Sequence, residues 1–139
     1  LQMEFWQACK NYMEEHKSFV KMRNPLPRNW SDISIGKSDI YVSAAVYSKT
    51  KTIEIWLVLV GENAKNNFDK LYELAFNSSL KEIDKEIAWD RMDKNVRSAV
   101  ILRKQADYFN KADWDNQFQW FKENLENYVK FFKPLLTKI

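Results

Sequence analysis

The sequence contains little glycine, proline, cysteine or histidine, and each shortage excludes a class of structure or site. The 139 residues include 2 glycines and 3 prolines, so we expect long helices and strands with few tight breaks. The single cysteine, Cys9, excludes an internal disulfide bond and a cysteine-based zinc site. The single histidine, His16, excludes a metal site built on paired histidines. We therefore expect no metal and no cofactor.

Long apolar runs are also missing. A membrane-spanning helix needs about 20 apolar residues, and the longest run here, residues 55–60, has the length of a strand. Charged residues such as Glu4 and Lys10 interrupt any signal peptide. We expect no membrane association and, from the lone cysteine, a cytoplasmic location. The chain begins with Leu1, so we expect a piece of a longer protein or a lost disordered start.

Aromatic residues are plentiful, at 15% of the chain, and hydrophobic residues make up 45%. A disordered chain lacks such content, and the length suits one domain, residues 1–139. The 22 basic and 19 acidic residues give a formal net charge of +3. This mild excess permits binding to a polyanion without requiring it.

Apolar periodicity predicts the order of the secondary-structure elements. Spacings of three and four residues predict helices over about residues 3–21, 63–76 and 113–134. Leu80, Ile83 and Ile87 predict a further short helical turn. Alternation predicts strands near residues 33–35, 40–47, 53–60, 88–92 and 98–102. The order α-β-β-β-α-β-β-α predicts an α+β domain, with helices packed on an antiparallel sheet of about five strands.

Gly36-Lys37-Ser38 resembles part of a phosphate-binding loop, but its context excludes that role. Such a loop needs a glycine five residues earlier, where this chain has Ser31. The loop must also lead into a helix, whereas Ile40 begins a predicted strand. We therefore expect a hairpin turn.

Basic residues gather in one part of the chain and form the candidate nucleic-acid-binding set. They are Arg91, Lys94, Arg97, Arg103 and Lys104. The nearby Trp89, Tyr108 and Phe109 are suited to stacking on bases while the basic groups neutralise phosphate. The alternative is a charged sheet edge that guards against aggregation. A further alternative is that Tyr41, Tyr47 and Trp56 form an exposed aromatic platform on the second face of the sheet, which is unusual unless helices cover both faces.

Catalytic patterns are weak throughout the sequence. Asp90 and Asp93 near a predicted strand leave a metal-dependent hydrolase open, although no third acid is indicated. Cys9 lies on the apolar stripe of the first helix, where a buried thiol behaves as a small hydrophobe. His16 lies toward the same stripe, where a packed or partly exposed histidine is expected. We therefore expect no catalytic residues, and the sequence favours a non-enzymatic module.

Several short motifs, in their order along the chain, resemble a known family. They are Phe5-Trp6, Pro25 with Trp30, Ser34-Ile35-Gly36-Lys37-Ser38, Gly61 with Ala64-Lys65 and Phe68, Trp89, Asp113-Trp114, Trp120 and Pro134. Over nearly its whole length the chain resembles the prokaryotic domain of unknown function 4268. It departs from the family at residues 77–79 and 81–86, which replace a more regular helix.

The resemblance implies no activity or catalytic residue, but it does imply a context. Members often form the C-terminal part of longer proteins, sometimes behind a nuclease-like domain. This implies an accessory role in nucleic-acid processing or defence. The first hypothesis is therefore a non-catalytic module that binds nucleic acid. The alternatives are a protein-interaction or dimerisation module, in which homo-oligomers form, and a metal-dependent hydrolase.

Overall fold

The computed structural model describes residues 1–78 and 86–139. The elements in these residues are α1 (Gln2–Glu15), β1 (Trp30–Ser34), β2 (Ile40–Tyr47), β3 (Thr52–Leu59), α2 (Ala64–Asn77), β4 (Ala88–Asp90), β5 (Ser98–Gln105), a 3-10 turn (Lys111–Asp113) and α3 (Trp114–Leu136). The predicted α+β class and element order are confirmed. In the predicted helical turn, Leu80 and Ile83 lie outside the described residues, and Ile87 is not helical.

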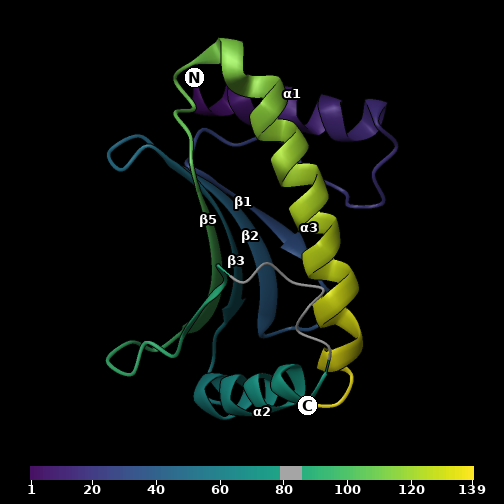
Figure 1. The fold of residues 1–139 in the computed structure, drawn as a ribbon, viewed down its shortest axis with the longest axis vertical. Coiled ribbons are helices and arrows are strands. Elements are labelled where there is room, and N and C mark those ends of the chain that lie inside the picture. Colours follow the sequence, from purple (N-terminus) through teal and green to yellow (C-terminus); the bar gives the residue numbers. More distant parts are fainter. Residues whose placement is uncertain (79–85) are drawn as a thin grey trace.

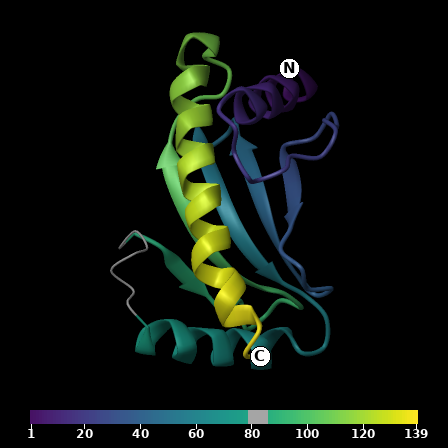
Figure 2. The same cartoon turned by 90° about the vertical axis from the view of Figure 1, so that its right-hand side faces the viewer.

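The strands of the described residues form one antiparallel sheet in the order β1-β2-β3-β5-β4. β3 is central, as the apolar residues on both of its faces predict. α1 and α3 lie on one face of the sheet, and α2 crosses its lower end (Figures 1 and 2). No helix of the described residues lies on the opposite face, which is called the open face below.

The core lies between the sheet and the helices. The predicted apolar stripe of α3 is buried, and Tyr128 on this stripe donates a hydrogen bond to the carbonyl of Val100 on β5 at 3.2 Å. Phe5 of α1 is fully buried, and its ring centroid lies 5.2 Å from that of Trp114 and 5.0 Å from that of Phe118. No helix of the described residues has the length and apolar content to span a membrane.

The first helix is shorter than its apolar stripe predicts. α1 ends at Glu15, because Lys17 adopts a left-handed conformation with φ of 53°. The N–H of Ser18 then reaches back to the carbonyl of Met13 at 2.9 Å, which closes the helix end and turns the chain away. The predicted extension to residue 21 is therefore wrong, and Phe19 is 48% exposed.

The loop around Gly36 joins two strands, as the sequence predicts. β1 ends at Ser34, β2 begins at Ile40, and Gly36 adopts a φ of 86°. This left-handed conformation favours glycine, and no helix follows the turn. The structure therefore places the Gly36-Lys37-Ser38 string in a strand connection that has no helix N-terminus to hold phosphate.

Cys9 is fully buried on α1, and burial raises the pKa of its thiol from its ordinary value to about 12. Because the neutral thiol is favoured in the folded state, its contribution to stability is complete below pH 9 and is lost as the pH rises toward 12. We expect iodoacetamide to modify native protein at pH 8 only as fast as the protein unfolds, since thiolate is the nucleophile. Mass spectrometry would measure the rate, with urea-unfolded protein as control, and rapid complete labelling of native protein would contradict the prediction.

Candidate functional site

The open face of the sheet carries aromatic side chains that no helix of the described residues covers. Alternation along β2 places Tyr41 and Tyr47 on this face, and alternation along β3 places Trp56 there. These three residues are the platform that the sequence offered as an alternative. All three are partly exposed. The alternate residues of the same strands, Val42, Ala44 and Val46 on β2 and Ile55 and Leu57 on β3, point to the opposite face and are buried in the core.

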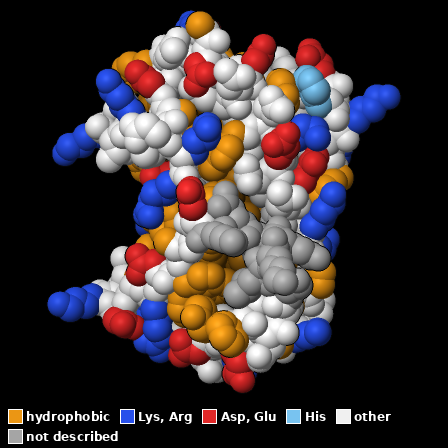
Figure 3. Space-filling view, viewed as in Figure 1, with side chains coloured by type: hydrophobic (Ala, Val, Ile, Leu, Met, Phe, Trp, Pro, Cys, Tyr) orange, Lys and Arg blue, Asp and Glu red, His pale blue; other side chains and the backbone are white. Residues whose placement is uncertain are grey.

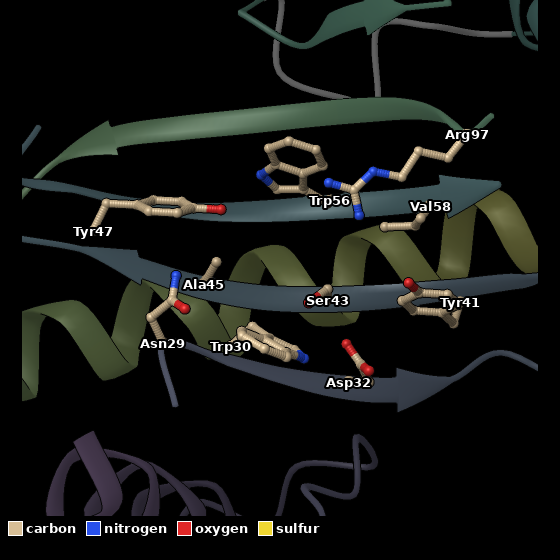
Figure 4. A pocket seen from close by; sticks show the side chains of 10 residues that line it. All are labelled: Asn29, Trp30, Asp32, Tyr41, Ser43, Ala45, Tyr47, Trp56, Val58 and Arg97. Atoms are coloured by element: carbon tan, nitrogen blue, oxygen red, sulfur yellow. The ribbon is translucent and has the colours of Figure 1, made fainter. Parts of the chain in front are cut away.

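A hollow of about 420 Å³ lies on this face (Figure 4). Its lining residues are Asn29, Trp30, Asp32, Tyr41, Ser43, Ala45, Tyr47, Trp56, Val58 and Arg97. The floor forms because β2 carries the small residues Ser43 and Ala45 between its two tyrosines, opposite Asp32 and Trp30 of β1. Small side chains flanked by rings on three strands leave a space with aromatic walls, and its volume is within the range of about 300–1,000 Å³ for small-molecule sites.

The Trp56 ring is held in place by its neighbours. Its indole N–H donates a hydrogen bond to Glu54 Oε1 at 2.9 Å. Glu54 is 5% exposed, accepts a second hydrogen bond from Thr52, and forms an ion pair with Arg103 at 3.3 Å. On the ring itself, the guanidinium carbon of Arg97 lies 5.6 Å from the centroid. Because the buried Glu54 carboxylate has several partners, it fixes the orientation of the Trp56 ring before any ligand binds.

Trp30 forms the wall on β1 and is the most exposed of the aromatic residues in the hollow, at 41%. The guanidinium carbon of Arg28 lies 4.6 Å from its ring centroid, within cation–π distance. The carbonyl of Arg28 accepts a hydrogen bond from the indole N–H of buried Trp6 at 2.8 Å. This hydrogen bond attaches the segment before β1 to α1. The backbone that carries the exposed Trp30 ring is therefore held in place.

Asp32 is the unusual polar group of the hollow. Its Oδ1 atom is covered and has no hydrogen-bond partner in the described residues. Burial, and then the charge of Asp32, raise the pKa of Tyr41, while Arg97 opposes the shift. Burial and Glu54 raise the pKa of Tyr47. Both phenols are therefore neutral hydrogen-bond donors near pH 7.

Two projecting connections flank the hollow. The β2–β3 turn carries Lys49 and Lys51, and the β4–β5 connection carries Lys94, all exposed. Figure 1 shows both connections extending beyond the sheet on the open side, and Figure 3 shows the outline hollowed between them. The open face is therefore a concave surface with basic side chains at both ends.

Arg91 is held by ion pairs within the chain. Its guanidinium forms two hydrogen bonds with the Asp69 carboxylate on α2, at 2.9 and 3.1 Å, and also pairs with Asp93. The bond to Arg91 lowers the pKa of Asp69, and the bonds to both carboxylates raise the pKa of Arg91. Arg91 therefore ties the β4–β5 connection to α2 and has little charge to offer a ligand.

Lys65 positions the chain beside Arg97. Its Nζ, which has three protons to donate, lies within hydrogen-bond distance of the carbonyls of Arg91, Met92 and Arg97, at 2.5, 2.8 and 2.7 Å, and of Ser98 Oγ at 3.0 Å. The Arg97 side chain extends from this anchored backbone into the hollow and has no ion pair with a carboxylate of the described residues (Figure 4). Its charge is therefore available to an anion.

The remaining predicted basic residues do not form one patch. Arg103 lies opposite Glu54 on the open face, about 20 Å along the strand from Arg97 at 3.3 Å per residue. Lys104 follows on the other face, near Asp113 and Trp120 at the start of α3. The structure brings Arg97 and Arg103 to the open face, places Lys94 at its rim, and separates Arg91 and Lys104 from it.

The carboxylates proposed for metal binding have other partners. Asp93 pairs with Arg91, and Asp90 Oδ1 accepts a hydrogen bond from the N–H of Met92 at 3.1 Å. In residues 1–78 and 86–139, no group of three or more His, Cys, Asp or Glu side chains could hold a metal. His16 is exposed and stacks on Tyr12, with ring centroids 3.9 Å apart. No observation in this region favours a hydrolase.

Comparison with known proteins identifies a family. The family described as domain of unknown function (DUF4268) matches residues 1–136. The chain belongs to this family. No curated protein and no solved structure gives a significant match. The resemblance drawn from the sequence is therefore confirmed, while the role of this DUF4268 domain must be inferred from its surface.

Three residues that line the hollow in this DUF4268 domain, Asn29, Trp30 and Asp32, were missed from the sequence. The first strand was expected near Ile33, whereas β1 begins at Trp30. The alternation Trp30-Ser31-Asp32-Ile33-Ser34 contains the missing signal, since Trp30 and Asp32 share the face opposite Ile33. The aromatic hollow on the open face shares Arg97 with the predicted basic set.

Proposed function

We propose that this chain is a non-catalytic binding module that holds single-stranded nucleic acid on its open sheet face. The observation that carries the proposal is the preformed hollow with Trp30 and Trp56 as walls. Beside them lies the Arg97 guanidinium, which has no ion pair with a carboxylate of residues 1–78 or 86–139. Single-strand binders combine rings for stacking with basic groups that neutralise the backbone.

The aromatic walls suit bases. Stacking requires a ring whose face a base can reach, and Trp30 is 41% exposed while Trp56 is partly exposed. Trp56 is already oriented by Glu54, so binding does not have to order it. Open antiparallel sheets with aromatic side chains stack two or three bases in known RNA-binding modules.

The charges suit a phosphate backbone. Arg97 lies inside the hollow without a carboxylate partner among the described residues, and Lys49, Lys51 and Lys94 lie on the flanking connections. Arg103 shares the face but is paired with Glu54. A strand crossing the concave surface between the two connections would therefore meet basic groups at both ends and rings in the middle.

Single strands suit this surface better than duplexes. The rings line the hollow (Figure 4), and the outline of the molecule is concave between the two projecting connections (Figure 3). A duplex keeps its base faces stacked inside, where these rings do not reach them. A duplex would reach the rim lysines alone, without stacking. An accessory role beside an upstream nuclease-like domain, as the resemblance implies, fits a module that holds a strand without cutting it.

Fluorescence anisotropy with a labelled 12-nucleotide DNA tests the proposal. We expect binding at 50 mM salt that weakens by 200 mM, with a log–log slope of about −0.7 for each phosphate contacted. RNA of the same sequence is expected to bind comparably, because rings stack on either, and the matching duplex is expected to bind more weakly. Absence of binding at 50 mM salt, or equal affinity for the duplex, would contradict the proposal.

A second function, protein interaction, is favoured by a different surface. Tyr72 and Phe76 on α2 stack on each other, with centroids 6.4 Å apart, and are 47% and 67% exposed. Adjacent exposed rings on a helix are typical of a protein contact. Light scattering over a range of concentrations tests self-association, and a monomer at every concentration would remove the dimerisation form of this alternative.

A further inference from the structure

We infer that the hollow reads one base of the bound strand and prefers guanine, with Asp32 as the residue that determines the preference. This inference rests on the proposed function and adds a base specificity to it. The observation behind it is the Asp32 carboxylate, whose Oδ1 atom has no hydrogen-bond partner in the described residues.

The Asp32 Oδ1 atom, unsatisfied within the described residues, favours a ligand that donates a hydrogen bond to it. A covered polar atom without a partner costs free energy that a hydrogen bond to a ligand would recover. Asp32 lies on β1 between Trp30 and Tyr41 (Figure 4), and the residue as a whole is partly exposed. The terminal torsion of an aspartate is broad, so the carboxylate can turn both oxygens toward a ligand in the hollow.

The ligand must be planar and must carry donors. Trp30 on β1 and Trp56 on β3 line the space on either side of β2, where the side chains of Ser43 and Ala45 are too small to fill it. A cationic ligand is disfavoured, because the Arg97 guanidinium already lies over the Trp56 ring. A neutral, planar base that donates hydrogen bonds to the Asp32 carboxylate fits between the rings and is not repelled by Arg97.

Among the bases, guanine presents two adjacent donors, N1–H and the 2-amino group, which match the two oxygens of a carboxylate. Adenine and cytosine place a ring-nitrogen acceptor beside their amino group, so the second oxygen of Asp32 would meet a lone pair. Thymine and uracil offer N3–H between two carbonyl oxygens. Paired charge-assisted hydrogen bonds are the strongest of these arrangements.

The test uses labelled heptanucleotides of thymine with one central guanine, hypoxanthine, adenine or cytosine, titrated against the whole chain. We expect the guanine strand to bind about 5- to 150-fold more tightly than the adenine strand, the discrimination of a good bidentate contact. Hypoxanthine lacks the 2-amino group and is expected to bind with intermediate affinity.

Asp32→Asn provides the decisive variant, because an amide has one acceptor and one donor. It should lose the guanine preference and bind the adenine or cytosine strand best, whereas Asp115→Asn, at an exposed position in the first turn of α3, should keep the original order. Thermal unfolding would confirm that both variants fold.

The outcomes separate this inference from the proposed function. Equal affinity of the wild-type chain for all four strands would overturn the base preference while leaving strand binding in place. An unchanged base order in Asp32→Asn would overturn the role of Asp32. Failure of every strand to bind at 50 mM salt would overturn the proposed function and this inference together.

Discussion

Replacing Phe5 by alanine is expected to lower the free energy of unfolding by about 3–5 kcal/mol, the cost of a large cavity in an aromatic core. Phe5 is fully buried, and its ring makes edge contacts with Trp6, Tyr108 and Trp114 at centroid distances of 5.1, 5.7 and 5.2 Å. These neighbours come from α1, the loop after β5 and α3. Loss of the ring therefore loosens the contact that joins both helices to the rest of the core.

Urea unfolding followed by circular dichroism measures the effect of Phe5→Ala. The midpoint should fall while the dependence of free energy on urea stays nearly constant. Phe19→Ala is the matched control, because Phe19 is 48% exposed and its cation–π contact with Lys130 is a surface one, so we expect a loss of about 1 kcal/mol or less. Equal losses for the two variants would show that the core is not organised around Phe5.

Replacing Trp30 and Trp56 together by alanine is expected to abolish measurable strand binding. Each stacked base contributes about 1–3 kcal/mol, so each single replacement should weaken affinity by about 5- to 150-fold. Trp30→Ala is the cleaner single variant, since this side chain is 41% exposed. In Trp56→Ala, Glu54 keeps its contacts with Thr52 and Arg103.

Trp120→Ala is the control for the binding experiment. Trp120 lies on α3, on the other face of the sheet, and is also partly exposed. Its loss should leave strand affinity unchanged within a factor of about two, since surface changes away from a site act within about 0.5 kcal/mol. An equal loss in Trp120→Ala and Trp30→Ala would place the binding surface elsewhere.

Strand alternation in the sequence predicts part of the open face but not its exposure. Alternation along β2 and β3 predicted which residues share a face, including Tyr41, Tyr47 and Trp56. Alternation does not tell whether helices cover that face, because an apolar stripe on a helix does not say which side of the sheet it meets. The open face therefore became visible only with the packing of α1 and α3 in three dimensions (Figure 2).

The basic residues were grouped by nearness in sequence, and the structure places them on different surfaces. Arg103 and Lys104 are adjacent in β5, so their side chains point to opposite faces. Arg91 was grouped with them, yet it pairs with Asp69, which lies 22 residues earlier on α2. Ion pairs between distant segments have no signature in a single sequence, whereas the separation of Arg103 from Lys104 follows from alternation alone.

The end of α1 shows a different limit. Lys17 takes a left-handed conformation that glycine usually supplies, so no residue type marks the helix end. Apolar residues such as Phe19 continue the helical spacing past it by coincidence. A periodic stripe thus predicted that the helix exists but not where it stops.

The most direct test of the central claim is an NMR titration of the tryptophan indole N–H signals with a single-stranded heptanucleotide. The account predicts that the signals of Trp30 and Trp56, assigned through Trp30→Phe and Trp56→Phe, shift in proportion to the bound fraction. The signals of Trp114, whose N–H is bonded to the carbonyl of Tyr108, and of Trp120 should stay in place. Binding that shifts Trp120 while leaving Trp30 and Trp56 unchanged would contradict the open face as the site.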